Sequence, residues 1–123
     1  MAVALVAIGV STAGTKACDL TGSFIVAIQS NDTTAVFDHI RQSGESIEGS
    51  AKFRDVRGDF RGTLKRNGVF SVVVSWDDGS AGVYTAFIAN TGQLSDGRTY
   101  EVGNTNNSAS WGLGSSSNRL QCH

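Results

Sequence analysis

Four aromatic side chains near the ends of expected β-strands are the residues best suited to hold a ligand. Flat aromatic rings stack on sugars and other planar molecules, and Trp and Tyr also carry a hydrogen-bonding group. Two aspartates that directly follow the first tryptophan add hydrogen-bond acceptors. Packing in a small barrel is the alternative role for the same rings. The predicted ligand-binding set is Trp76, Asp77, Asp78, Tyr84, Tyr100 and Trp111.

Clustered aspartates raise the question of a metal site. Carboxylate oxygens gathered in loops can hold calcium, which takes six to eight such ligands. No spacing in this chain matches a known calcium loop, and Asp is also an ordinary turn residue. Two cysteines and two histidines at unsuitable spacing exclude the usual zinc sites. We therefore expect no metal and no cofactor. The aspartates considered are Asp32, Asp55, Asp59, Asp77 and Asp78.

No group of residues suggests catalysis. His39 falls in an expected strand and His123 ends the sequence, so neither can be placed beside a nucleophile and an orienting group. Glu45 and Glu48 lie near a turn, where a solvated hairpin face is their expected role. We predict that the protein is not an enzyme.

The two cysteines, Cys18 and Cys122, bracket nearly the whole folded part of the chain. A disulfide between them would close a loop of about 100 residues and stabilise the fold by roughly 4–5 kcal/mol on the chain-entropy estimate. Such a bond predicts an oxidising compartment, so we expect a secreted or periplasmic protein.

The 123 residues suffice for one domain with its own core. Ten basic and eleven acidic residues nearly balance. This balance gives no electrostatic reason to expect nucleic acid or an anionic membrane as a partner.

The chain begins with an apolar prefix, residues 1–17, ahead of a domain over residues 18–123. Ala2–Val10 is continuously apolar but far too short to span a bilayer, so no membrane span is expected. Thr15 and Ala17 are small residues placed as a signal-peptidase site requires, whereas the basic n-region is missing. The prefix is therefore interpreted as a signal-peptide remnant or as an apolar strand that pairs with something.

Short apolar runs separated by turn residues predict an all-β fold. The strongest run is Val69–Trp76, in which Phe70, Val72 and Val74 alternate with outward positions. Asn67-Gly68 before it is a strong hairpin turn. Glycines inside the alternation at Gly49 and Gly62 suggest strands that bend or approach a neighbour closely. The eight expected strands are 20–29, 34–42, 46–54, 59–66, 69–76, 82–89, 93–101 and 109–121.

The strand count and the cysteines support each other. In an antiparallel meander of eight strands, the first strand starts at the end where the last one finishes, so Cys18 reaches Cys122 if the sheet closes. We predict an eight-stranded antiparallel up-and-down barrel closed by one disulfide. Tight turns would then lie at the disulfide end, and the polar connections 30–33, 55–58, 77–81 and 102–108 at the other end.

Several of these segments resemble the avidin and streptavidin family. Leu20-Thr21-Gly22 followed by Phe24 resembles the family's opening strand. Phe70–Trp76, the following polar loop, Val83-Tyr84-Thr85 and the turn at Gly92 resemble its central strands. The resemblance implies a ligand-binding barrel.

The resemblance does not extend to the biotin contacts. The family's first-strand tryptophan corresponds to Phe24, its ring-oxygen-binding asparagine to Val26, and a tyrosine to Ala51. Ser30 and Trp76 match family positions, and Tyr100 stands where a later tryptophan is expected. Losing donors to one buried carbonyl costs several kcal/mol in sum, so tight biotin binding is not expected.

We therefore expect a secreted, non-catalytic binding module whose loop-rich end takes a glycan or other small polar ligand. The alternative is a self-assembling structural subunit, a homo-oligomer in which Ala2–Val10 adds as a strand to a neighbouring barrel. A grip on a protein partner through the loops is a third reading that the sequence does not separate from the first.

Overall fold

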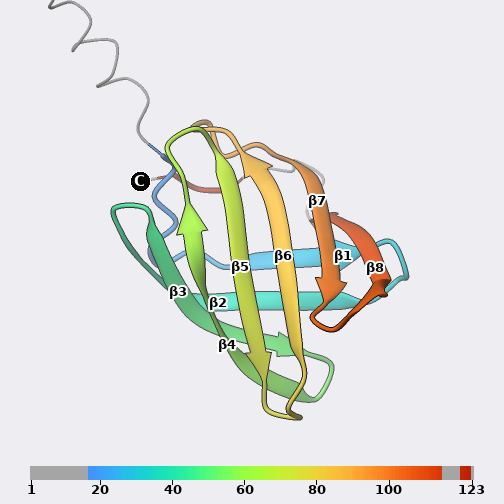
Figure 1. Cartoon of the computed structure of the whole chain (residues 1–123). Helices are drawn as coiled ribbons and strands as arrows, with labels where there is room; N and C mark the ends of the chain where they lie inside the picture. Colours follow the sequence, from blue (N-terminus) through green and yellow to red (C-terminus); the bar gives the residue numbers. More distant parts are fainter. Residues whose placement is uncertain (1–16, 115–119, 123) are drawn as a thin grey trace, which may run out of the picture.

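The chain forms a closed eight-stranded barrel, as a computed structural model shows (Figure 1). The structure describes residues 17–114 and 120–122. Each strand pairs antiparallel with its neighbours in sequence, and β1 pairs with β8 to close the sheet. The strands are β1 Ile25–Gln29, β2 Thr34–Ser43, β3 Ser46–Phe53, β4 Val56–Leu64, β5 Val69–Trp76, β6 Ala81–Ile88, β7 Leu94–Glu101 and β8 Asn104–Leu113.

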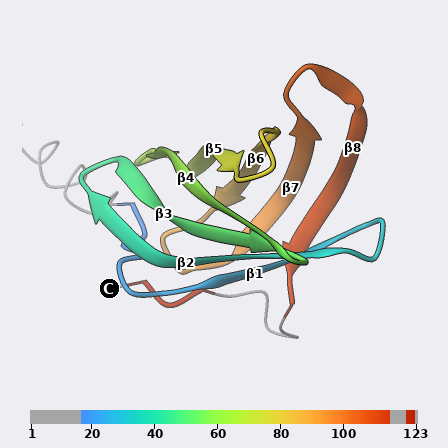
Figure 2. The ribbon, with the colours of Figure 1, turned by 90° about the horizontal axis from the view of Figure 1, so that it is seen from below.

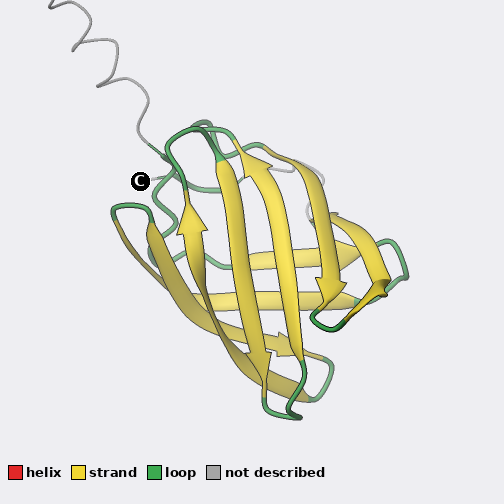
Figure 3. Cartoon of the chain, viewed as in Figure 1, coloured by secondary structure: helices red, strands yellow, loops and turns green. Residues whose placement is uncertain are grey.

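This architecture confirms the predicted fold class. All regular structure in the described part of the chain is strand (Figure 3), and it includes no helix long and apolar enough to cross a membrane. In β5, side chains point alternately into the barrel and out to solvent, as the sequence predicts. Phe70, Val72 and Val74 are buried, while Val69 and Val73 are exposed. Inward side chains from all eight strands make one continuous core.

The disulfide lies at the end where the meander places it. Cys18 and Cys122 are bonded, with their Cα atoms 4.8 Å apart. The turns at Gly44, Gly68 and Gly92 lie at this end and adopt positive φ, which glycine tolerates without strain. We call this the disulfide end and the opposite one the open end.

Segments from both termini cover the disulfide end. Gln42 accepts a hydrogen bond from the Leu20 N–H through its Oε1 and donates one from Nε2 to the carbonyl of Cys18. The Leu120 N–H donates to the Gly92 carbonyl at 2.7 Å. Leu20 is fully buried. The core is therefore sealed from solvent at this end by chain that belongs to no strand.

Three of the expected strands were misplaced. The first strand starts at Ile25, not at residue 20, because Gly22 has positive φ and the Ser23 N–H bonds back to the Leu20 carbonyl in a turn. The fourth starts at Val56, not 59, because Arg54 adopts positive φ and tightens the preceding turn. The β3–β4 connection at the open end is thus short.

The largest error concerns the last strand, which was expected over 109–121 and extends over Asn104–Leu113. Gly103 takes positive φ and makes a tight turn, so the supposed polar connection 102–108 is mostly strand paired with β7. Asn- and Ser-rich composition was read as loop, but ladder bonds with β7 override it. Residues 115–119, and residues 1–16 of the apolar prefix, lie outside the described residues.

Two strand glycines are required by close approach, as the sequence suggested. A Cβ at Gly62 would lie 2.0 Å from the Ser71 carbonyl oxygen, and one at Gly49 would lie 2.7 Å from both the Asp38 carbonyl oxygen and the Phe60 ring. Both glycines therefore allow β3 and β4 to press against their neighbours where the barrel wall curves.

Substituting Gly62→Ala is expected to lower the free energy of unfolding by about 2 kcal/mol or more, because the methyl group collides with backbone that cannot rotate away. Gly112→Ala is the matched strand control: its Cβ would meet nothing within 4 Å, and the effect should stay within about 0.5 kcal/mol. Urea unfolding followed by tryptophan fluorescence measures both. Equal stability of the two variants would contradict the close approach.

Replacing both cysteines with alanine should lower the free energy of unfolding by about 2–5 kcal/mol. The bond closes nearly the whole domain, so its loss frees the unfolded chain and also loosens the cover of the disulfide end. Chemical unfolding of the double variant, compared with the wild type with and without reductant, tests this. A variant that unfolds at the same midpoint as the oxidised wild type would refute it.

Candidate ligand pocket

A cavity of about 470 Å³ opens at the open end of the barrel. Its lining comes from seven strands, all except β2, and from the β1–β2, β3–β4 and β5–β6 turns. We call it the mouth pocket. Seen from below in Figure 2, the β7–β8 hairpin stands apart from the β1–β2 turn at this end.

The floor of the mouth pocket is polar and uncharged. Gln29, Tyr84 and Thr99 line it and are only 7%, 4% and 8% exposed. Gln29 Nε2 donates a 2.8 Å hydrogen bond to the Tyr84 hydroxyl. The side-chain Oε1 of Gln29 has no recorded partner within the described residues. Because none of their buried side-chain polar atoms lacks a partner, this oxygen must face the open space of the pocket.

Rings of the core hold Tyr84 in place. Its ring packs edge-on against Phe37, with centroids 4.9 Å apart, and against Trp111 at 6.0 Å. Burial raises the pKa of the Tyr84 hydroxyl, and hydrogen bonds with Thr99 and Gln29 oppose that rise. Tyr84 therefore presents a neutral hydroxyl of fixed orientation at the floor.

The wall is aromatic. The Phe53 and Trp76 rings lie 6.1 Å apart at a tilt of 53°, and both line the pocket together with the partly exposed Tyr100. Phe53 comes from the end of β3, Trp76 from the end of β5 and Tyr100 from β7. Ring faces from well-separated parts of the sequence thus meet around one space.

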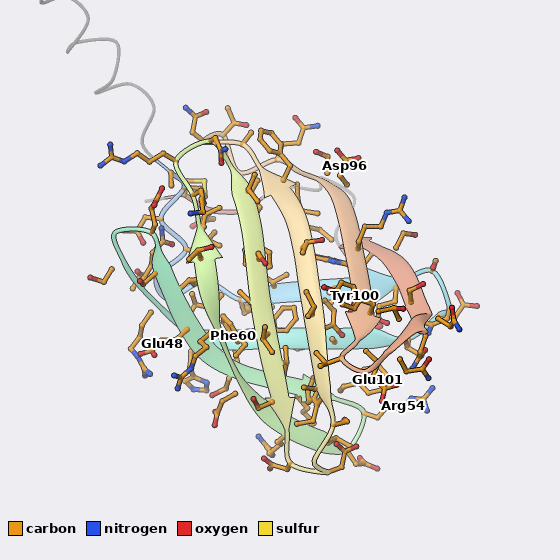
Figure 4. All side chains as sticks on the ribbon, viewed as in Figure 1. Glu48, Arg54, Phe60, Asp96, Tyr100 and Glu101 are labelled. Atoms are coloured by element: carbon orange, nitrogen blue, oxygen red, sulfur yellow. A yellow bond between two sulfur atoms is a disulfide. The ribbon has the colours of Figure 1, made fainter. Side chains whose placement is uncertain are left out.

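Charged groups stand at the rim. The Arg54 guanidinium lies 5.3 Å from the centre of the Phe53 ring, a cation–π contact. Glu101 accepts a 2.9 Å hydrogen bond from Asn107 Nδ2. Asp78 accepts bonds from the Ser80 hydroxyl and N–H, which lower its pKa. Figure 4 shows Arg54, Tyr100 and Glu101 gathered at this end.

The structure brings four of the six predicted site residues together. Trp76, Asp78, Tyr84 and Tyr100 all line the mouth pocket. Asp77 does not, because alternation at the strand end turns it away, and its N–H instead donates to the Arg57 carbonyl.

Trp111 is the other predicted residue that does not line the pocket. It is 5% exposed, donates from Nε1 to the Arg98 carbonyl at 3.0 Å, and packs against Phe70 and Tyr84. It lies two residues deeper than Ala109, the pocket-lining residue on the same strand face. Trp111 therefore supports the floor rather than forming it.

Sequence reasoning missed the floor and part of the rim. Gln29 and Thr99 occupy inward positions of their strands, where β1 otherwise carries Ile25 and Ala27. A polar residue at the inward position of a strand end was the available signal. Arg54 and Glu101 carried no such signal, since charged residues at turns are common.

The position-by-position likeness to the avidin family fails in the first strand. Phe24 is 61% exposed, and Val26 lies on the outer face with it, whereas Ile25, Ala27 and Gln29 face inward. The counterparts assigned to the family's tryptophan and asparagine thus point away from the pocket. A barrel consistent with an avidin-like fold is present without that arrangement of contacts.

The arrangement offers stacking and hydrogen bonding. Among the described residues, no three His, Cys, Asp or Glu side chains gather closely enough to hold a metal ion. His39 lies outside the pocket on the exposed surface, 3.0 Å from Asp38 through Nδ1.

The raised pKa of Tyr84 predicts a specific loss of stability at alkaline pH. The unfolded chain gives up this proton near pH 10, before the folded barrel does, so the stability from burying the neutral phenol is complete below about pH 10 and declines above it. The stability difference between wild type and Tyr84→Phe should therefore narrow between about pH 9 and pH 11. Urea unfolding across this range measures the difference. A difference that stays constant would contradict the burial of a titrating Tyr84.

Known proteins give no further guide to this pocket. Neither protein-family models nor curated proteins nor solved structures yielded a match to this chain.

Proposed function

We propose that the protein is a secreted or periplasmic, non-catalytic binding module whose mouth pocket takes a small polar ligand, with a glycan favoured. The observation that carries this proposal is the joining of an aromatic wall and a buried, uncharged polar floor in one cavity. Its volume of about 470 Å³ falls in the range of small-molecule sites. One or two sugar rings fit such a space.

The chemistry of the lining suits sugars. A pyranose presents C–H groups on its faces and hydroxyl groups around its edge. Trp76 and Tyr100 supply ring faces for the former. The side-chain carbonyl oxygen of Gln29 can accept a hydrogen bond, and the Tyr84 and Thr99 hydroxyls can accept or donate one. All three groups therefore suit the hydroxyl groups at the edge of a sugar. No charged side chain lies among the floor residues, which favours an uncharged group at the bottom of the pocket.

Two further observations support the proposal. The disulfide is compatible with export to an oxidising compartment. The barrel is of the kind that binds ligands at one end in the avidin family, which the sequence resembles, although the missing first-strand contacts argue against biotin itself.

Titration of the wild type with a panel of neutral monosaccharides and their methyl glycosides, followed by amide chemical shifts, tests the function. Shifts should concentrate on the residues of the mouth pocket. Trp76→Ala should weaken binding at least tenfold, because it removes the largest ring of the aromatic wall. Its melting temperature should stay close to that of the wild type, since Trp76 is only partly buried.

Phe87→Ala is the matched control, because Phe87 is an exposed aromatic on the outer face of β6. It should bind like the wild type. Absence of any shift with millimolar concentrations of the sugar panel, or equal binding by Trp76→Ala, would overturn the glycan proposal.

A further inference from the structure

The seam between β8 and β1 is short. Its ladder has the pairs Ala27↔Leu113, Ile28↔Gly112 and Gln29↔Trp111. Beyond it, the Ser30 N–H donates to the Ser110 carbonyl and the Ser110 N–H donates to the Ser30 hydroxyl. β8 continues past this point to Asn104. No backbone bond from the described part of β1 or of the β1–β2 turn reaches residues 104–109, which we call the β8 edge.

The chain leaves the seam at Asp32. This residue adopts positive φ (64°), and its N–H bonds back to the Gln29 carbonyl. If the ladder continued, Asp32 would lie opposite Ser108. Ile28 lies opposite Gly112 and Ser30 opposite Ser110, so the next hydrogen-bonded pair, two residues further along each strand, would be Asp32 and Ser108. The turn instead sends the chain into β2, so the place beside Ser108 is left without a strand.

The backbone of Ser108 points toward that place. Both the N–H and the carbonyl of Ser110 bond toward β1. In a strand these groups alternate sides from one residue to the next, so those of Ala109 point to β7 and those of Ser108 to the open side. Ser108 thus offers one donor and one acceptor in strand geometry, next to the mouth pocket that it also lines.

The β8 edge lacks most of the devices by which proteins protect such edges. Asn104–Ser110 contains no charged residue and no proline, and residues 104–108 are exposed. Only the register shift beside Glu101 interrupts the ladder with β7 on the other side. An unprotected edge of this kind accepts another strand readily.

We propose that Ala2–Val10 of a second copy of this chain adds to the β8 edge as an antiparallel strand. The run has nine residues without charge or proline, and four of them are the β-branched residues Val and Ile, which favour strands. Extended, it measures about 30 Å and covers the roughly 20 Å of the edge. Addition shields this apolar run and supplies the bonds that Ser108 lacks.

The direction of the added strand indicates that it comes from a second copy and not from the same chain. An antiparallel strand on β8 follows the direction of β1 and ends, at Val10, near the tip of the β7–β8 hairpin at the open end. The described chain begins at Ala17, next to the disulfide end. Val10 and Ala17 are seven residue steps apart and so lie at most about 25 Å from each other. Strands β7 and β8, with eight and ten residues, are about 27–34 Å long.

Light scattering of the full chain on a sizing column, with its prefix verified by intact mass, tests the proposal. The wild type should form dimers or larger assemblies at micromolar concentration. Ser108→Pro removes the edge N–H, and Val6→Pro interrupts the added strand, so each should shift the chain to monomer by tenfold or more in dissociation constant. Ser108→Ala keeps the N–H and should assemble like the wild type. Melting temperatures of the three variants separate lost assembly from lost folding.

A monomeric wild-type chain that retains its prefix would overturn the proposal, as would native production of a chain from which the prefix has been removed. Assembly that survives Ser108→Pro would place the contact elsewhere. Assembly that needs Ser108 but survives Val6→Pro would mean that another strand, such as the β8 edge of the second copy, occupies the site, and would overturn Ala2–Val10 as the occupant. None of these outcomes depends on sugar binding.

Discussion

Closure of the sheet between its first and last strands is the constraint on which the rest of the structure depends. The other seven strand pairs follow from short turns between neighbours in sequence, whereas β1 and β8 meet across the whole chain. Their ladder is short, and the Cys18–Cys122 bond ties together the two segments that flank it. The same shortness that makes this seam dependent on the disulfide leaves part of β8 unpaired at the opposite end. The disulfide and the β8 edge thus lie at opposite ends of the same short β1–β8 ladder, and the mouth pocket lies beside the unpaired end.

The fold was predictable because several independent features of the sequence agree. Alternation in Val69–Trp76 and turn glycines at regular spacing indicate an antiparallel meander, and the positions of the two cysteines favour a closed sheet with an even number of strands. The errors fell where composition and pairing disagree. Asn104–Ser108 has the composition of a loop, and only its ladder with β7 across the tight turn at Gly103 makes it a strand. Leu20 looked like strand because it is apolar, but it covers the disulfide end instead.

The candidate site was only partly predictable for a similar reason. Aromatic residues are easily recognised as candidates in a sequence, and the predicted Trp76, Tyr84 and Tyr100 do line the pocket. Whether an aromatic faces a cavity or supports its floor depends on depth along the barrel, which a single strand does not reveal. Trp111 therefore looked equivalent to Trp76, although its indole is bonded to backbone inside the wall. Gln29 and Thr99 matter because of what lies across the barrel from them, and their one local signal is a polar residue at an inward strand position.

The covering of the disulfide end has a consequence for exchange kinetics. If the mouth pocket binds a ligand as proposed, the ligand enters and leaves at the open end, past Arg54, Glu101 and their neighbours on the rim. Residence time would then depend on the rim as well as on the floor. Changes at Arg54 would alter it with little effect on the strands, because the β3–β4 turn takes no part in the pairing of β1 with β8. The residues that close the barrel would thus differ from those that control the exchange of its ligand.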